Sequence, residues 1–131
     1  MMQELPQVDT AQLKQWSATK AQECNCGLGA CAGWESITES RWPAPQMPAV
    51  ATLRPPDLTE PTYEEHHPQG TRYESADAPV ATLFFPYNRC DIHQCSACQR
   101  HLLRYTEYGG YYVDHRVRCL TGAPVADISA V

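Results

Sequence analysis

Hydrophobic and polar positions alternate most clearly in the last third of the chain. Residues 100–108 (RHLLRYTEY) and 111–120 (YYVDHRVRCL) are rich in β-branched and aromatic side chains and flank the pair Gly109-Gly110. Two such runs around a two-residue glycine turn are typical of a β-hairpin. The pattern therefore predicts a hairpin over residues 100–120.

Counting outward from a two-residue turn predicts which side chains of this hairpin share a face. It pairs Leu102 with Val117 and Arg100 with Cys119 on the face expected to point inward. The opposite face is expected to meet solvent or a partner. Its candidate partner-binding residues are His101, Tyr105, Tyr112, Arg116 and Arg118.

The start of the chain has the pattern of a helix. Residues 8–23 (VDTAQLKQWSATKAQE) place Asp9 as N-cap and Gln12 three residues later as its capping-box partner. Leu13 and Trp16 would share one face. The helix is expected to end where three cysteines and three glycines begin to alternate.

The middle of the chain predicts mostly extended structure. Residues 34–42 are expected to form one or two helical turns, whereas the six prolines within residues 43–61 exclude a long helix. The tetrapeptide VATL occurs at 50–53 and again at 80–83, and both copies are predicted to be strands. The second copy would form a core strand that ends at Pro86.

Composition narrows the class of protein. The chain has 131 residues, 43% of them hydrophobic, and a net charge of -5, which fits one domain with a modest core. The first residues do not resemble a secretory leader, and no apolar run is long enough to span a membrane. A cytoplasmic protein without membrane contact is therefore expected.

Seven cysteines are the strongest chemical signal in the sequence. In a reducing cytoplasm, closely spaced cysteines favour metal binding over disulfides. Two residues between ligands allow a single turn to direct two thiolates at one zinc ion, and residues 95–98 have this Cys-x-x-Cys spacing. The candidate ligands form two groups: Cys24, Cys26 and Cys31, and Cys90, Cys95 and Cys98.

The order strand, Cys-x-x-Cys, strand over residues 90–120 resembles the zinc-ribbon and treble-clef families. This resemblance implies a knuckle at Cys95 and Cys98 that holds a structural zinc. The sequence departs from those families in two ways. Gln99 stands where they usually have a glycine, and the remaining ligands do not form a second Cys-x-x-Cys.

Three sources could supply the remaining ligands. Cys90 and Cys119 are local to the knuckle, whereas ligation by the N-terminal group is slightly favoured because it would explain three otherwise isolated cysteines. Two separate metal ions completed by His66, His67 or His93 are the third option.

An iron-sulfur cluster is the alternative to zinc. Residues 90–98 have the C-x4-C-x2-C spacing of plant-type ferredoxins. That alternative would make the chain a redox protein, and a thiol-based sensor that releases zinc on oxidation is a related option.

No complete catalytic constellation is present in the sequence, so an enzyme is not expected. A zinc-binding interaction module or accessory subunit that binds another protein is the leading hypothesis. Single-stranded nucleic acid is the alternative partner, because arginines and tyrosines occur together on the outer face of the predicted hairpin.

These patterns together predict a small α+β domain held together by metal, with a C-terminal antiparallel sheet built on the hairpin. A single domain is expected, with a helical Cys-rich segment (1–42), a proline-rich arm (43–78), a zinc-ribbon-like sheet (79–121) and a tail (122–131).

Overall fold

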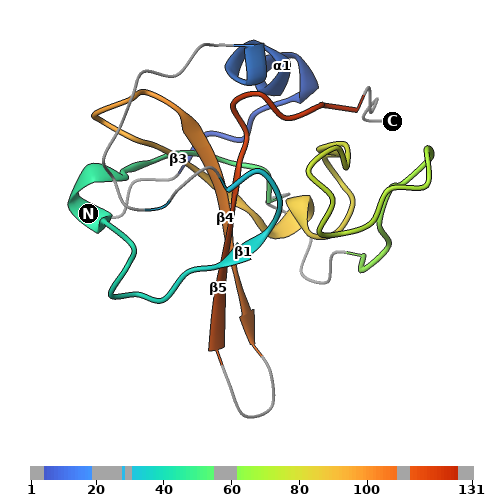
Figure 1. The fold of residues 1–131 in the computed structure, drawn as a ribbon. Coiled ribbons are helices and arrows are strands. Elements are labelled where there is room, and N and C mark those ends of the chain that lie inside the picture. The colour runs from blue at the N-terminus through green and yellow to red at the C-terminus, as the bar shows by residue number, and fades with distance from the viewer. Residues whose placement is uncertain (1–4, 19–27, 29–30, 55–61, 109–112, 127–131) are drawn as a thin grey trace.

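The computed structural model describes residues 5–18, 28, 31–54, 62–108 and 113–126. Its elements are α1 (Thr10–Ala18), β1 (Glu35–Ser36), η1 (Ala44–Gln46), β2 (Ala49–Thr52), η2 (Tyr87–Arg89), β3 (Asp91–Gln94), β4 (His101–Tyr108) and β5 (Val113–Cys119) (Figure 1). The strands form one five-stranded sheet in the order β1-β5-β4-β3-β2, with antiparallel neighbours. The described residues thus have the predicted α+β class.

Helix α1 begins at the predicted N-cap Asp9, but the Gln12 side chain does not complete the predicted capping box, since its Nε2 donates to Gln15 Oε1 at 3.4 Å. The Gln12 backbone N–H donates to Asp9 Oδ1 at 3.0 Å, and the Leu13 N–H donates to the Asp9 carbonyl at 3.1 Å, which is the geometry of an N-cap. Leu13 is fully buried, and Trp16 packs partly buried against the same core cluster. The predicted end of the helix, near residue 23, lies outside the described residues.

The predicted hairpin is confirmed, but its register is not. Tyr108 pairs with Val113 and Leu102 pairs with Cys119, so four residues rather than two separate the paired ends. Because side chains alternate with a period of two, a shift by two residues keeps every side chain on its predicted face. Leu102 therefore still shares a face with Val117.

The prediction of helical turns for residues 34–42 holds only for the second half of this range. Glu35 and Ser36 form β1 against β5, and one helical turn follows, in which the Trp42 N–H donates to the Thr38 carbonyl at 3.1 Å. The first VATL copy lies in β2 as predicted.

The second VATL copy forms no strand. Val80 makes a single bridge to Val125, and the chain then turns. The Val80 N–H donates to the Pro124 carbonyl, and the Phe85 N–H donates to the Glu64 carbonyl, each at 2.8 Å. These backbone N–H groups are thus satisfied by isolated hydrogen bonds and not by the ladder of a neighbouring strand.

The sheet packs on both faces, since successive side chains of a strand point to opposite sides. We call one face the aromatic side. Its buried cluster is Leu13, Trp34, Ala51, Leu53, Val80, Tyr87, Cys90, Ile92, Leu103, Tyr105, Leu120 and Ala123. We call the other the cysteine side. Its buried cluster is Leu28, Cys31, Ile37, Trp42, Met47, Cys95, Cys98, Leu102, Val117 and Cys119.

The hairpin face predicted to be exposed is in fact the aromatic side. Tyr105 is 4% exposed, His101 is 4% exposed and Arg118 is fully buried. The prediction that these three form a contact surface is therefore wrong. Other parts of the chain cover them: Trp16 of α1 stacks on His101, and the Arg118 guanidinium bonds to the carbonyl oxygens of residues 76 and 78. The irregular segment of residues 62–89 lies on this side of the sheet (Figure 1).

The other two residues of the predicted contact surface are Arg116 and Tyr112. Arg116 is half-buried, and it bonds to Asp114 Oδ2 at 2.9 Å and to the Tyr73 hydroxyl at 3.2 Å. Tyr112 lies outside the described residues. Arg116 thus pairs within the chain.

Candidate metal centre

The Cys-x-x-Cys segment forms a tight turn between β3 and β4. The Cys95 N–H donates to the Arg100 carbonyl at 3.0 Å, and the Gln99 N–H donates to the Cys95 carbonyl at 2.8 Å. Gln99 has φ +69°, in the left-handed region that favours glycine. Gln99, where the zinc-ribbon resemblance leads us to expect glycine, thus has a backbone conformation that glycine favours. Both cysteines are fully buried.

Two further cysteines lie with the knuckle on the cysteine side. Cys119 ends β5 opposite Leu102 of β4, and its N–H donates to the Cys31 carbonyl at 2.7 Å. Cys31 is fully buried and Cys119 is 9% exposed. Three separate segments of the chain therefore bring four cysteines into one buried cluster.

Two polar side chains, those of Gln46 and Arg100, lie near these sulfur atoms. Gln46 Nε2 donates to Cys95 Sγ at 3.2 Å, and the Gln46 carbonyl accepts the Ser96 N–H at 2.9 Å. The positive charge of Arg100 lies near Cys119 and Cys31 and partly opposes the rise in the pKa of both thiols. No sequence pattern singles out Gln46, which lies in the proline-rich arm. Arg100 could have been noticed only by its position two residues after the knuckle.

Burial dominates the acidity of these thiols. It raises the pKa of Cys31 to about 11, with Glu35 adding to the shift and Arg100 opposing it. It also raises the pKa of Cys119, again opposed by Arg100. Both groups are therefore neutral thiols near pH 7 in the absence of a cation, and neither is an activated nucleophile.

The donor set suits a zinc ion, although the side chains do not stand in ligating geometry. In the described part of the chain, no group of three or more His, Cys, Asp and Glu side chains is arranged to hold a metal ion. The Sγ atoms of Cys31 and Cys119 instead contact the carbonyl oxygens of Leu28 and Thr121 at 3.2 and 3.4 Å. Four thiols in one cluster nevertheless match the all-cysteine ligand set of structural zinc sites.

Cys90 lies on the opposite side of the sheet from this cluster. It packs in the aromatic-side cluster with Ile92, and its Sγ contacts the Pro86 carbonyl at 3.3 Å. The structure thus does not place Cys90 beside Cys95 and Cys98, as both the local ligand set and the ferredoxin-like spacing require.

The candidate histidines have other contacts. His93 Nδ1 lies 2.9 Å from the Met47 carbonyl, and burial lowers the pKa of its imidazole. His67 contacts Glu65 and Thr71, each at 2.8 Å, and His66 packs on the ring of Phe84.

The N-terminal candidates cannot all be placed. Cys24 and Cys26 lie outside the described residues, whereas Cys31 of the same group lies in the cysteine-side cluster. The structure thus joins one N-terminal cysteine to the knuckle.

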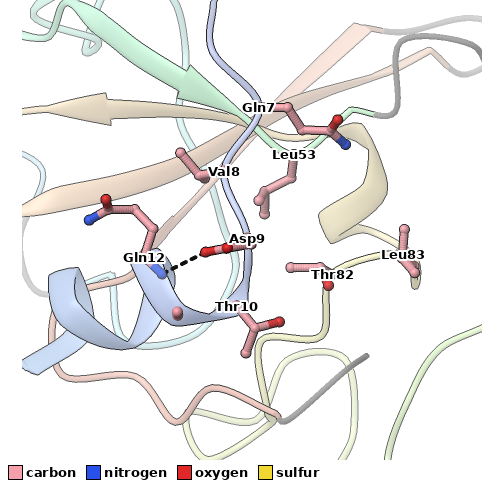
Figure 2. Close-up of a pocket in the computed structure, with 9 residues that line it drawn as sticks. Gln7, Val8, Asp9, Thr10, Gln12, Leu53, Thr82 and Leu83 are labelled. Carbon is pink, nitrogen blue, oxygen red and sulfur yellow. Dashed lines mark hydrogen bonds between the residues drawn. The ribbon is translucent and has the colours of Figure 1, made fainter. Parts of the chain in front are cut away.

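A hollow of about 590 Å³ lies at the first turn of α1, away from the cysteines (Figure 2). The side chains around it are Gln7, Val8, Asp9, Thr10, Ala11, Gln12, Leu53, Thr82 and Leu83. Figure 2 shows the Asp9 carboxylate bonded to the backbone of Gln12. The chain itself therefore caps this helix end, which leaves no unused anion site there.

Comparison with protein-family models, curated proteins and solved structures gives no match. Among the residues that the structure describes, no helix is long and apolar enough to cross a membrane.

Proposed function

We propose that this chain is a zinc-binding interaction module, in which Cys31, Cys95, Cys98 and Cys119 hold a structural zinc ion. One observation carries the proposal: four buried cysteines from three separate segments gather around a Cys-x-x-Cys knuckle in one cluster. A zinc bound there would connect β5, the β3–β4 turn and the segment before β1. It would act as a crosslink between segments that are far apart in the sequence.

The ligand chemistry favours a structural ion over a catalytic one. Zinc with four thiolate ligands has no open coordination position for water or substrate. Cys31, Cys95 and Cys98 are also fully buried, so a substrate would have no direct route to the ion. We therefore propose that the chain binds partners and does not catalyse a reaction.

Gln46 and Arg100 would stabilise the loaded site. Four thiolates and one Zn²⁺ carry a net charge of -2, which a buried environment disfavours. The Gln46 amide beside Cys95 and the Arg100 guanidinium beside Cys119 would donate hydrogen bonds to the thiolates. A reducing compartment such as the cytoplasm would keep the thiols available for the metal.

Binding to another protein fits the surface better than binding to nucleic acid. Of the hairpin residues predicted as nucleic-acid contacts, Arg118, Tyr105 and His101 are buried, and Arg116 bonds to Asp114. A stacking platform needs exposed rings, and Tyr105 does not offer one.

The experiment is metal analysis of freshly purified protein, together with an absorbance spectrum. We expect one zinc per chain in the wild type and loss of zinc in Cys95→Ser/Cys98→Ser, in Cys31→Ser and in Cys119→Ser. Cys90→Ala is the matched control, since Cys90 is equally buried but lies on the aromatic side. It should keep its zinc.

Other outcomes would change the proposal in specific ways. Iron with visible absorbance would indicate electron transfer or sensing, and protein without metal would refute the proposal. Zinc that is kept in Cys119→Ser but lost in Cys24→Ser/Cys26→Ser would replace Cys119 by an N-terminal ligand.

A further inference from the structure

Cys31 and Cys119 are joined directly through the backbone. The Cys119 N–H donates to the Cys31 carbonyl at 2.7 Å, although the two residues belong to segments far apart in the sequence. A backbone N–H···O=C bond between two residues holds their Cα atoms roughly 5–6 Å apart. Disulfides span Cα distances of about 4.4–6.8 Å. The backbone contact therefore sets these two cysteines at the separation that a disulfide needs.

The side chains of the two cysteines also lie close together. Both pack in the buried cluster of the cysteine side. The Cys119 thiol is one of the groups that raise the pKa of Cys31, an effect that acts between neighbouring groups. Cys31 has φ +48°, a conformation that a residue with a β-carbon disfavours. The chain therefore keeps this cysteine against Cys119 in spite of an unfavourable backbone conformation.

The two cysteines differ in their access to solvent. Cys119 is 9% exposed, whereas Cys31, Cys95 and Cys98 are fully buried. A small oxidant such as hydrogen peroxide therefore reaches Cys119 first. Burial raises the pKa of Cys119 and keeps the metal-free thiol neutral, but a cysteine that binds zinc is deprotonated. Since the thiolate is the form that peroxide oxidises, Cys119 of the zinc-loaded protein is the first point of attack.

We propose that Cys31 and Cys119 are a redox pair that exchanges the proposed zinc for a disulfide. The Cys119 thiolate attacks one oxygen of hydrogen peroxide, the O–O bond breaks, and Cys119 becomes a sulfenic acid. The Cys31 thiolate then attacks the Cys119 sulfur, the S–O bond breaks, and the hydroxyl group leaves as water.

The reaction balances without a further reactant. The two sulfur atoms lose two electrons in total, and the peroxide takes up these electrons and two protons to give two water molecules. Of the proposed ligands, Cys95 and Cys98 alone remain, which is too few for a structural site, so the zinc leaves. The inference rests on the proposed function, because it describes how that same site is regulated.

The disulfide would keep part of what the ion joins. Cys119 ends β5 and Cys31 lies in the segment before β1, so the disulfide connects two of the three segments that the zinc would connect. Only the turn between β3 and β4, with Cys95 and Cys98, is released. We therefore expect oxidation to free this turn and to leave β1 and β5 in place.

A disulfide between Cys95 and Cys98 is the competing outcome. Both lie within one turn, but both are fully buried. As long as the cysteine side stays packed, the oxidant reaches Cys119 before either of them.

The test is exposure of the zinc-loaded protein to hydrogen peroxide, followed by alkylation of the remaining thiols and tryptic mass mapping without reduction. Cleavage after lysine and arginine separates the candidate cysteines into the peptides 21–41, 90–100 and 119–131. We expect a disulfide that links the first peptide, at Cys31, to the third. A colorimetric chelator should record one zinc released for each disulfide formed. A reductant with added zinc should restore the reduced, loaded protein.

Three variants identify the cysteines that react. Cys31→Ser should form no link between the peptides 21–41 and 119–131, whereas Cys24→Ser/Cys26→Ser should form it as the wild type does. Cys90→Ala is the matched control, because Cys90 is buried on the aromatic side. It should change neither the link nor the release of zinc.

Several results would overturn the inference. They are a disulfide within the peptide 90–100, a link through Cys24 or Cys26, oxidation of Cys119 to a sulfinic or sulfonic acid without a link, and zinc that stays bound after the link has formed. In protein that carried zinc before oxidation, each of them contradicts the redox pair and not the zinc site. Protein purified without zinc that still links Cys31 to Cys119 contradicts the zinc site and not the pairing of the two cysteines.

Discussion

The two sides of the sheet are stabilised by different kinds of groups. On the aromatic side, the Trp34 ring contacts Tyr73, Tyr87 and Tyr105 at centroid distances of 5.9, 5.8 and 5.1 Å. On the cysteine side, four of the ten residues in the buried cluster are cysteines. Aromatic rings bring large buried area and favourable ring geometry, whereas a thiol buries little area. The cysteine side therefore gains less from packing than the aromatic side does.

Each side also has one group that links distant segments. On the aromatic side it is Arg118, whose guanidinium donates to the carbonyls of Ala32, Ala76 and Ala78 at 3.3, 3.0 and 2.7 Å and to the Tyr87 hydroxyl. On the cysteine side, the proposed zinc would have this role. With the proposed zinc bound, an amino-acid side chain would close one face of the sheet and an ion would close the other.

Removal of the metal is expected to have the largest effect. A structural zinc contributes on the order of 10 kcal/mol of apparent binding free energy, which is comparable to the whole stability of a small domain. A chelator should therefore unfold the cysteine side, and amide hydrogen exchange should rise first at Leu102 and Val117. Identical thermal unfolding with and without chelator would show that both sides are stabilised by packing alone.

Loss of the buried guanidinium should have the next largest effect. Arg118→Met leaves three carbonyl groups without their donor in a dry environment, so we expect a loss of about 4 kcal/mol in unfolding free energy. Urea denaturation measures this loss, and the zinc content should not change. Arg72→Met, at an exposed position, should change stability by less than about 0.5 kcal/mol. A loss below about 1 kcal/mol for Arg118→Met would contradict the linking role.

Two neighbouring leucines allow the packing of each side to be tested separately. Leu102 and Leu103 are both fully buried, but Leu102 packs on the cysteine side and Leu103 on the aromatic side. Each change to alanine should cost about 3 kcal/mol. Only Leu102→Ala should speed the release of zinc to a colorimetric chelator. Equal release rates in the two variants would mean that the metal site is not coupled to the packing of its own side.

Local signals in the sequence predicted local structure well. The Asp9 cap, the β4–β5 hairpin and the turn at Cys95 and Cys98 depend on residues close in sequence. The hairpin register was not predictable from Gly109-Gly110, because opposing buried side chains also select the pairing. The apolar run at residues 79–87 predicted a strand. Its backbone instead makes isolated hydrogen bonds, and in the part of the chain that the structure describes no strand lies beside it.

The contacts that form the candidate site join segments far apart in the sequence, and local sequence patterns do not predict them. The sequence indicated that cysteines gather, but not that Cys31 and Cys119 lie side by side, since one hydrogen bond between segments far apart in sequence brings them together. Arg118 has the pattern of an exposed strand position. Arg118 is buried because residues 76–78 cover it. These residues show no regular hydrophobic pattern that would have predicted this contact.

The smallest predicted effect concerns pH and acts on the aromatic side alone. The His101 ring stacks on Trp16 at a centroid distance of 4.3 Å, and burial lowers the pKa of the imidazole to about 4. An unfolded histidine has a pKa near 6.5. Between these two values the unfolded chain binds a proton that the folded chain does not, so stability falls as pH falls through this range.

This titration should cost about 1 kcal/mol of unfolding free energy between about pH 7.5 and about pH 5.5. His101→Phe keeps a ring against Trp16 but has no proton to bind, so its stability should fall less over the same range. Acid also weakens zinc binding, but it does so in both proteins, and the difference between their urea midpoints therefore isolates His101. Equal pH dependence in the two proteins would show that His101 does not contribute to the acid sensitivity.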